Sequence, residues 1–228
     1  MFYSVVVSVI LAILLLSLWF SPVYAQTNTN ELTIKNIKQT KLSPEEKITL
    51  IDGVYSNLNK GKLVLEPYPA SLRIMNVIRF LSTNNLVDSD RERLEGYIRA
   101  ESDYLNQNLE YHLLANHLLE NLFALLMSAN YFNDKTLQSR IEHILKVQLD
   151  EQILPDGAHY ELSPMYHKII FFRVLEAYHY LSSESELKAM LREKAGQMLS
   201  WLKNISFANH EIPHFNDSAN SITYSNTY

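Results

Sequence analysis

Apolar residues recur at intervals of three and four over most of the chain beyond residue 40. Between residues 70 and 82, for example, Leu72, Met75 and Ile78 repeat at this spacing, which is typical of amphipathic helices. The pattern predicts seven helices, at about residues 44–58, 70–82, 88–106, 111–131, 134–152, 164–181 and 184–203.

Local signals support the ends of these helices. Ser43 and Glu46 form a capping box, and Ser163 followed by Pro164 is a typical helix start. No segment alternates between apolar and polar residues as a strand does. Since helices joined by short links pack antiparallel to their neighbours, we expect a curved array of helical hairpins with a cleft at one end. The links at 155–163 and 210–218 should then lie close together.

The first 25 residues form a separate region. From Phe2 to Phe20 no residue is charged, and Val23 and Ala25 fit the pattern of a signal-peptidase site. We expect residues 1–25 to be a signal peptide and residues 26–42 a linker. A retained membrane anchor is the alternative, because the apolar stretch is long enough to span a bilayer. In both cases the rest of the chain is periplasmic or secreted.

Composition narrows the class of protein. With 228 residues, 47% of them hydrophobic and 20% charged, the chain is globular and long enough to build a sizeable core. A net charge of −5 gives no basic surface for nucleic acid. The sequence has no cysteine, and its eight histidines show no HExxH spacing. We therefore expect neither a metal site nor another cofactor.

Polar residues gather around the turn Pro155-Asp156-Gly157. His159, Tyr160 and Glu161 follow it, and Tyr166 and His167 fall in the first turn of the next helix. The positive end of a helix dipole favours anions, so this segment is suited to an acidic substrate. An ordinary polar surface turn is the alternative.

Two further clusters lie on either side of this turn. On the helix at 111–131, His112, Asn116 and Glu120 share one face, with His117 and Asn121 beside it. This face predicts a helix end that opens on a wet cleft, or else a solvated surface. The last cluster runs from His210 to Ser218.

Four segments together resemble the heparinase II/III-like polysaccharide lyases. They are Glu66–Ile74, Asn116–Asn121, Pro155–His167 and Phe215–Ser218. The resemblance covers about residues 66–218 and implies an all-α fold, an incomplete α/α toroid built of antiparallel helical hairpins, over residues 43–228. It also implies that a β-sandwich domain follows in the full-length protein, so that this chain alone is at best weakly active.

The resemblance also implies roles for particular residues. Asn116 and His117 match the pair that contacts the carboxylate of a uronic acid, and Tyr166 matches the residue that transfers a proton. We expect further contacts with an acidic polysaccharide or oligosaccharide from a wider set of residues: Tyr68, Arg73, His159, Tyr160, Glu161, His167, Asn216 and Asp217.

The residue types suit β-elimination in a uronic-acid polymer. This reaction removes the C5 proton beside a carboxylate and expels the sugar oxygen at C4. Asn116 and His117 can donate hydrogen bonds to the carboxylate as negative charge develops. Tyr166 can act as general acid or, if ionised, as base.

Two other functions fit the same sequence. A glycoside hydrolase on an α/α toroid would use two carboxylates, such as Asp156, Glu161 or Asp217. A non-catalytic domain that binds acidic glycans would need no proton transfer at all. Only a lyase leaves an unsaturated uronic acid as product.

Overall fold

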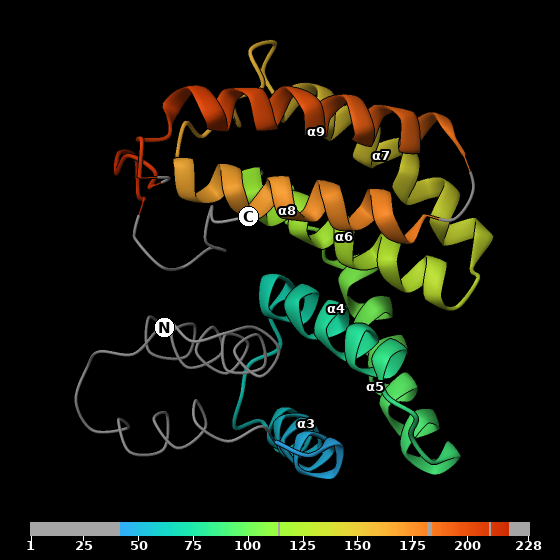
Figure 1. Cartoon of the computed structure of the whole chain (residues 1–228). Coiled ribbons are helices and arrows are strands. Elements are labelled where there is room, and N and C mark those ends of the chain that lie inside the picture. The colour runs from blue at the N-terminus through green and yellow to red at the C-terminus, as the bar shows by residue number, and fades with distance from the viewer. Residues whose placement is uncertain (1–41, 114, 182–183, 210, 219–228) are drawn as a thin grey trace. The chain divides into compact units, whose positions relative to one another are not determined.

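The computed structural model describes residues 42–113, 115–181, 184–209 and 211–218. These residues form seven α-helices (Figure 1): α3 Pro44–Asn59, α4 Pro67–Thr83, α5 Asp88–Gln107, α6 Ala115–Tyr131, α7 Lys135–Gln152, α8 Pro164–Tyr180 and α9 Glu186–Ile205. The described part contains no strand beyond an isolated bridge between Ile153 and His159. The predicted signal peptide lies outside the described residues. None of the described helices combines the length and apolar character needed to cross a bilayer.

All seven predicted helices are present, and their ends follow local hydrogen bonding. At the start of α3 the Ser43 hydroxyl accepts from the Glu46 N–H at 3.2 Å, and the Ser43 N–H donates to the Glu46 carboxylate at 2.7 Å. Two helix starts differ from the prediction by more than two residues. Helix α4 begins earlier, at Pro67, where proline suits the first helical position. Helix α6 begins at Ala115, not at 111. Ala115 has a φ of 54°, outside the right-handed helical region, so the residues before it cannot continue into α6 as one helix.

The chain divides into two compact units, residues 1–108 and 109–228. In the described part of the first unit, α4 and α5 pack as an antiparallel hairpin, since Arg73 near the start of α4 meets Glu101 near the end of α5. The Glu101 carboxylate also accepts from the Tyr55 hydroxyl of α3 at 2.8 Å. All three residues are buried, so this group joins α3, α4 and α5, the helices of this unit that the structure describes.

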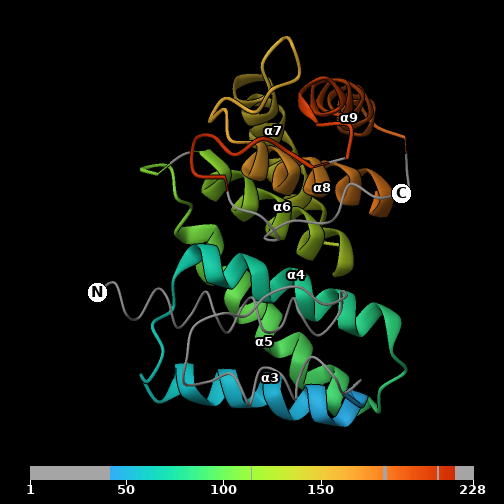
Figure 2. The same ribbon diagram turned by 60° about the vertical axis from the view of Figure 1, so that its left-hand side comes forward.

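The described residues of the second unit form two helical hairpins, α6–α7 and α8–α9. Figure 2 shows α7 and α9 on one side of this unit and α6 and α8 on the other. Helices α6 and α8 run parallel, because Glu120 pairs with Arg173 and, further along both helices, the Phe123 carbonyl lies 3.5 Å from the Tyr180 hydroxyl. Helices α7 and α9 also run parallel, because Lys146 pairs with Glu186 and Asp150 with Lys194. The N-terminal ends of α6 and α8 therefore lie at the same end of the unit.

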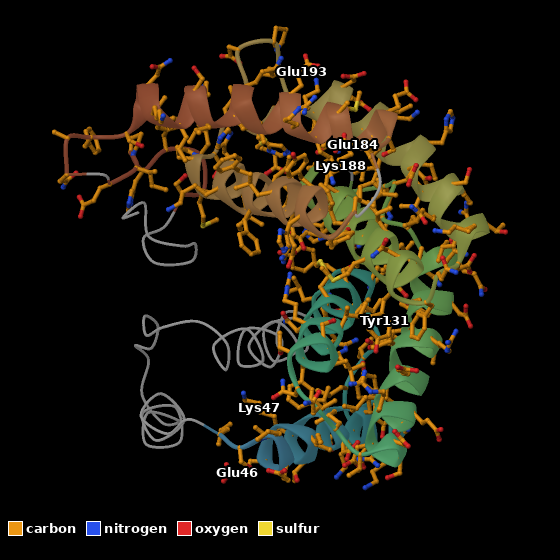
Figure 3. The ribbon with its side chains drawn as sticks, turned by 45° about the vertical axis from the view of Figure 1, so that its right-hand side comes forward. Glu46, Lys47, Tyr131, Glu184, Lys188 and Glu193 are labelled. Atoms are coloured by element: carbon orange, nitrogen blue, oxygen red, sulfur yellow. The ribbon has the colours of Figure 1, made fainter. Side chains whose placement is uncertain are left out.

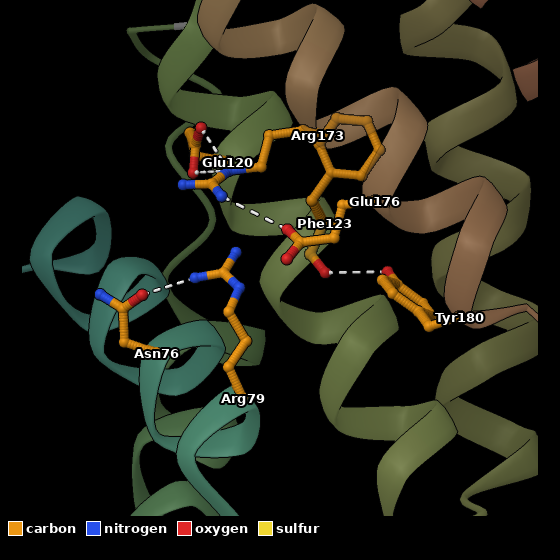
Figure 4. A network of polar contacts seen from close by, with 7 residues as sticks. All are labelled: Asn76, Arg79, Glu120, Phe123, Arg173, Glu176 and Tyr180. Atoms are coloured by element: carbon orange, nitrogen blue, oxygen red, sulfur yellow. Dashed lines mark hydrogen bonds and ion pairs between the residues drawn. The ribbon is translucent and has the colours of Figure 1, made fainter. Parts of the chain in front are cut away.

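Helix α6 forms the centre of this second unit. Every residue from Leu118 to Ala129 is buried. This includes Glu120, whose two carboxylate oxygens each lie 2.9 Å from Arg173 Nε and share its one N–H (Figure 4). Arg173 also reaches Glu176 of its own helix at 3.4 Å. By contrast, α9 carries exposed charges such as Glu193 (Figure 3). An all-α fold of antiparallel hairpins is thus confirmed.

Candidate functional site

The turn after α7 is fixed by its own backbone and by α9. The Leu154 N–H donates to the Ala158 carbonyl at 2.9 Å, and the Asp156 carboxylate accepts from the Ala158 N–H at 3.0 Å. Gly157 has a φ of 90°, and a Cβ atom there would lie 2.2 Å from the Gln197 carbonyl of α9. Only glycine combines this backbone conformation with so close an approach. The turn therefore rests directly on the α9 backbone.

Two histidines of this region lie in the core. His167 Nε2 lies 3.0 Å from the Met198 carbonyl, and its Nδ1 accepts from the His159 N–H at 3.3 Å. His167 therefore carries its proton on Nε2. Burial lowers the pKa of His159 to about 3 and that of His167 to about 4, so both are neutral near pH 7. Each is 0% exposed, which favours a packing role over the predicted contact with sugar.

Glu161 connects this turn to the first turn of α6. Its carboxylate oxygen accepts a hydrogen bond from the Asn116 backbone N–H at 3.0 Å. The first N–H groups of a helix have no partner within the helix, and a negative charge is favourable at this end of the dipole. The neighbouring Tyr160 hydroxyl interacts with the Ala115 backbone. Two consecutive residues of the turn thus hold the start of α6.

A second group of hydrogen bonds holds the start of α8. We call it the α8 clasp, and we call the contacts of Glu161 and Tyr160 with the start of α6 the α6 clasp. The Ser163 hydroxyl accepts from the Tyr166 N–H at 3.3 Å and lies 3.1 Å from the Ser218 hydroxyl, which accepts from the Met165 N–H at 3.3 Å. The Asn216 side chain donates to the Leu162 carbonyl at 3.2 Å. The predicted proximity of the two links is confirmed for their described residues.

Tyr166 lies in the first turn of α8, and its side chain is partly exposed. Partial burial raises the pKa of its phenol, and the negative charges of Glu161 and Asp217 raise it further. The phenol is therefore protonated at neutral pH. The two carboxylates reach it from different segments, Glu161 from the turn after α7 and Asp217 from the chain after α9.

The polar face predicted on the fourth helix is only partly confirmed. Asn116 lies in the first turn of α6 and is 6% exposed. His117 is more open, with 39% of its side chain exposed, and its Nδ1 lies 3.3 Å from the Glu110 carboxylate. His112 precedes the helix instead of lying on it, and Glu120 is fully buried against Arg173. The expected wet face is thus confined to the first turn.

The helix was predicted to be wet further along because spacing alone does not show which partner faces a polar side chain. Asn121 is also buried and pairs with Glu110: its amide donates to the carboxylate at 3.0 Å, and its carbonyl accepts from the Glu110 N–H at 3.0 Å. Glu110 thus holds both Asn121 and His117. No motif in the sequence marks it, because it lies before the helix and is recognised only by these contacts.

Arg73 and Tyr68 belong to the other unit, on α4. Arg73 is 3% exposed and pairs with Glu101 at 2.6 Å, which favours a structural role. Tyr68 is partly exposed in the first turn of α4. Within the described residues no group of three or more acidic or histidine side chains is arranged to hold a metal ion.

The arrangement in the second unit suits the binding of an acidic ligand, because hydrogen-bonding side chains lie at the positive ends of two helices. The N-terminal ends of two parallel helices carry Asn116, His117 and Tyr166, two of them partly exposed. Among the described residues the Asn116 amide side chain makes no hydrogen bond.

The family model for the heparinase II/III N-terminus matches residues 70–227. The chain therefore belongs to the heparinase II/III family of polysaccharide lyases, as the four sequence segments predicted.

A solved structure supports the same fold. The chain is similar to heparan sulfate lyase HepC from Pedobacter heparinus, with a TM-score of 0.54 and 19% sequence identity. The match covers 74% of this chain and 30% of HepC, so the chain spans less than a third of that protein's length. The predicted fold class, an incomplete α/α toroid, is thereby confirmed. No curated protein matches the sequence.

Proposed function

We propose that this chain supplies carboxylate-binding and proton-donating groups to a polysaccharide lyase that cleaves uronic-acid-containing polysaccharide by β-elimination. The observation that carries the proposal is the pairing of helix starts. Asn116 and His117 lie in the first turn of α6, Tyr166 lies in the first turn of the parallel helix α8, and Glu161 bonds to the Asn116 N–H from the turn before Tyr166. HepC, with a similar fold, is a heparan sulfate lyase.

In this mechanism Asn116 and His117 bind the carboxylate of the uronic acid. Loss of the C5 proton places negative charge on that carboxylate, and hydrogen-bond donors aimed at it stabilise the transition state more than the ground state. The Glu110 carboxylate orients the His117 ring through Nδ1. The positive end of the α6 dipole adds to the attraction for the substrate anion.

Tyr166 acts as the general acid. Its raised pKa keeps the phenol protonated at neutral pH, so it can transfer a proton to the sugar oxygen that leaves from C4. To act as the base, Tyr166 would have to be ionised, and the negative charges of Glu161 and Asp217 disfavour its ionised form. The base that removes the C5 proton is then a different group.

The experiment that tests this proposal measures the product. The full-length protein, which includes the expected β-sandwich domain, is incubated with several uronic-acid polymers, and unsaturated uronic acid is followed by its ultraviolet absorbance. Tyr166→Phe should lower turnover by about 10²- to 10⁴-fold with little change in substrate binding, because the ring remains and only the proton donor is lost. Asn116→Ala should also act mainly on the rate.

Other outcomes point to other functions. New reducing ends without ultraviolet absorbance would indicate a hydrolase, and binding of acidic oligosaccharide without any product would indicate a glycan-binding domain. Wild-type turnover in Tyr166→Phe would remove Tyr166 from the mechanism.

Export is part of the proposal, because polymeric substrates of this kind lie outside the cytoplasm. It is supported by the uncharged segment from Phe2 to Phe20 and the site at Ala25. Cell fractionation of the protein, with Ala25→Arg to block cleavage, tests it. Retention of the unaltered protein in the cytoplasm would contradict it.

A further inference from the structure

Glu161 is a poor direct ligand for a uronic acid, because its negative charge would repel the substrate carboxylate. Yet it acts on both the residue assigned to binding and the residue assigned to proton transfer. Its carboxylate oxygen is 3.0 Å from the Asn116 backbone N–H, and its charge acts on the Tyr166 phenol. One side chain therefore contacts the start of α6 and influences the start of α8.

We propose that Glu161 is a positioning residue which couples Asn116 to Tyr166 by holding the first turn of α6 against the turn that leads into α8. This role rests on the proposed function, because the proposed function is what makes Asn116 a substrate-binding residue and Tyr166 the proton donor. It replaces a direct contact between Glu161 and sugar.

The local geometry supports this role. Helix α6 begins at Ala115, whose φ of 54° ends the preceding turn abruptly, so its first N–H groups depend on partners from elsewhere. The turn from Ile153 to Glu161 supplies them and is itself immobilised by Gly157 on α9 and by the bridge between Ile153 and His159. Glu161 thus connects Asn116 to a rigid support.

The second effect of Glu161 is electrostatic. Partial burial is the largest cause of the raised pKa of Tyr166, and the charges of Glu161 and Asp217 add to it. Asp217 has no hydrogen bond to Asn116 among the described residues. Both carboxylates therefore raise the pKa of Tyr166, but only Glu161 accepts a hydrogen bond from the Asn116 N–H.

This difference allows a test that needs no turnover. Tyrosines are labelled with ¹³C at Cζ, the Tyr166 signal is assigned with Tyr166→Phe, and its titration midpoint is measured. Hydrogen exchange of the Asn116 amide is measured in the same proteins. Glu161→Gln keeps an oxygen acceptor but removes the charge, whereas Glu161→Ala removes both.

In Glu161→Gln the Tyr166 midpoint should fall towards that of an ordinary tyrosine, and exchange at Asn116 should stay within about threefold of the wild-type rate. In Glu161→Ala the midpoint should fall as well, and exchange at Asn116 should rise by about 10- to 100-fold, because a hydrogen bond to a charged group is lost. Asp217→Asn should lower the midpoint and leave exchange at Asn116 unchanged. Glu92→Gln, at an exposed glutamate of α5, should change neither.

The proposal is overturned if Glu161→Ala leaves exchange at Asn116 unchanged, or if Glu161→Gln leaves the Tyr166 midpoint unchanged. If Glu161→Ala does not fold, the glutamine variant and Asp217→Asn still decide the electrostatic half. Exchange at Asn116 in Glu161→Asp, whose shorter side chain withdraws the acceptor, then decides the other half. Failure of the proposed function gives a different result: the Tyr166 midpoint and the exchange at Asn116 respond as expected, but no unsaturated product forms. Where product forms, Glu161→Gln should move the alkaline limb of kcat to lower pH.

Discussion

The buried carboxylates of the helix interiors and the carboxylates near the helix starts have different partners. Glu101 and Glu120 each lie against a guanidinium, that of Arg73 at 2.6 Å and that of Arg173 at 2.9 Å. Glu161 instead meets a backbone N–H, and within the described residues it forms no ion pair. An arginine neutralises the interior charges, whereas the charge of Glu161 continues to act on a neighbouring tyrosine.

Carboxylates thus have two roles in this protein, one in helix packing and one in shifting the ionisation of a neighbouring group. A carboxylate held by arginine fixes the packing of two helices, and its charge is compensated where it stands. A carboxylate held by peptide N–H groups at a helix start is fixed equally well, yet its charge remains available to shift the ionisation of a nearby group. The candidate site is thus distinguished less by burial than by what balances each charge.

The largest expected effect comes from breaking an interior pair. Arg173→Ala leaves Glu120 buried and uncompensated, and should lower the free energy of unfolding by about 3–5 kcal/mol. Asp150→Ala, which removes a carboxylate 64% exposed and paired with Lys194, should cost less than about 1 kcal/mol. Urea denaturation measures both, and equal losses would show that burying the ion pair makes no difference to its contribution.

A somewhat smaller effect tests whether the turn is as rigid as the interior. Gly157→Ala forces a Cβ against the Gln197 carbonyl at a positive φ and should destabilise the protein by about 2–4 kcal/mol. Gly196→Ala, one residue from Gln197 but with open space around it, should stabilise the helix by about 0.5–1 kcal/mol. A turn that tolerates the first change would not be an adequate support for Glu161.

The two buried histidines extend the comparison to interior bases. In the unfolded chain each takes up a proton near its ordinary pKa of 6.5, whereas the folded protein resists protonation until about pH 4 for His167 and about pH 3 for His159. The unfolded state binds more protons in this window, so stability is full above pH 6.5 and is lost as the pH falls.

Between pH 6.5 and 4 the free energy of unfolding should fall by about 1.4 kcal/mol per pH unit for each histidine. This is the slope of the stability profile. His167→Gln should reduce it by about one histidine's share. His143→Gln, at an exposed position of α7, is the matched control for the substitution, and its stability profile is compared with that of His167→Gln. A flat profile between pH 6.5 and 4 would mean that these rings are not held neutral by burial.

The smallest expected effect concerns the clasp at α8. Ser218→Ala removes the hydroxyl that bonds to Ser163 and to the Met165 N–H and should cost about 1 kcal/mol, the usual value of a helix cap. Ser200→Ala, at an exposed position inside α9, should change stability by less than about 0.5 kcal/mol. Thermal unfolding measures both, and no difference between them would show that the clasp contributes little.

Much of the fold was predictable because it depends on local order in the sequence. Periodicity located all seven helices, and Ser43 and Ser163 marked two of their starts through bonds to residues three positions away. The start of α6 was wrong because the left-handed conformation of Ala115 carries no residue signal; glycine or asparagine would have marked it.

The site was predictable only in part. The clustering of polar residues at the links indicated where the two clasps would lie, and the family resemblance selected Asn116 and Tyr166. The partners of Glu120 and Asn121 were not predictable, because a polar face looks the same whether water or a buried arginine lies opposite. Likewise, nothing in the sequence distinguishes His159 in the core from His117 near the surface.

The parallel stacking of hairpins has a consequence for the order of assembly. Each hairpin joins helices adjacent in sequence and closes a short loop, which costs little entropy. The bonds from Glu161 to Asn116 and from Ser218 to Ser163 span 45 and 55 residues. We expect the hairpins to form first and these two long-range bonds last. The same bonds should open before the helices in native-state hydrogen exchange, so the end that bears Tyr166 would be the first part of this unit to loosen and the last to be completed.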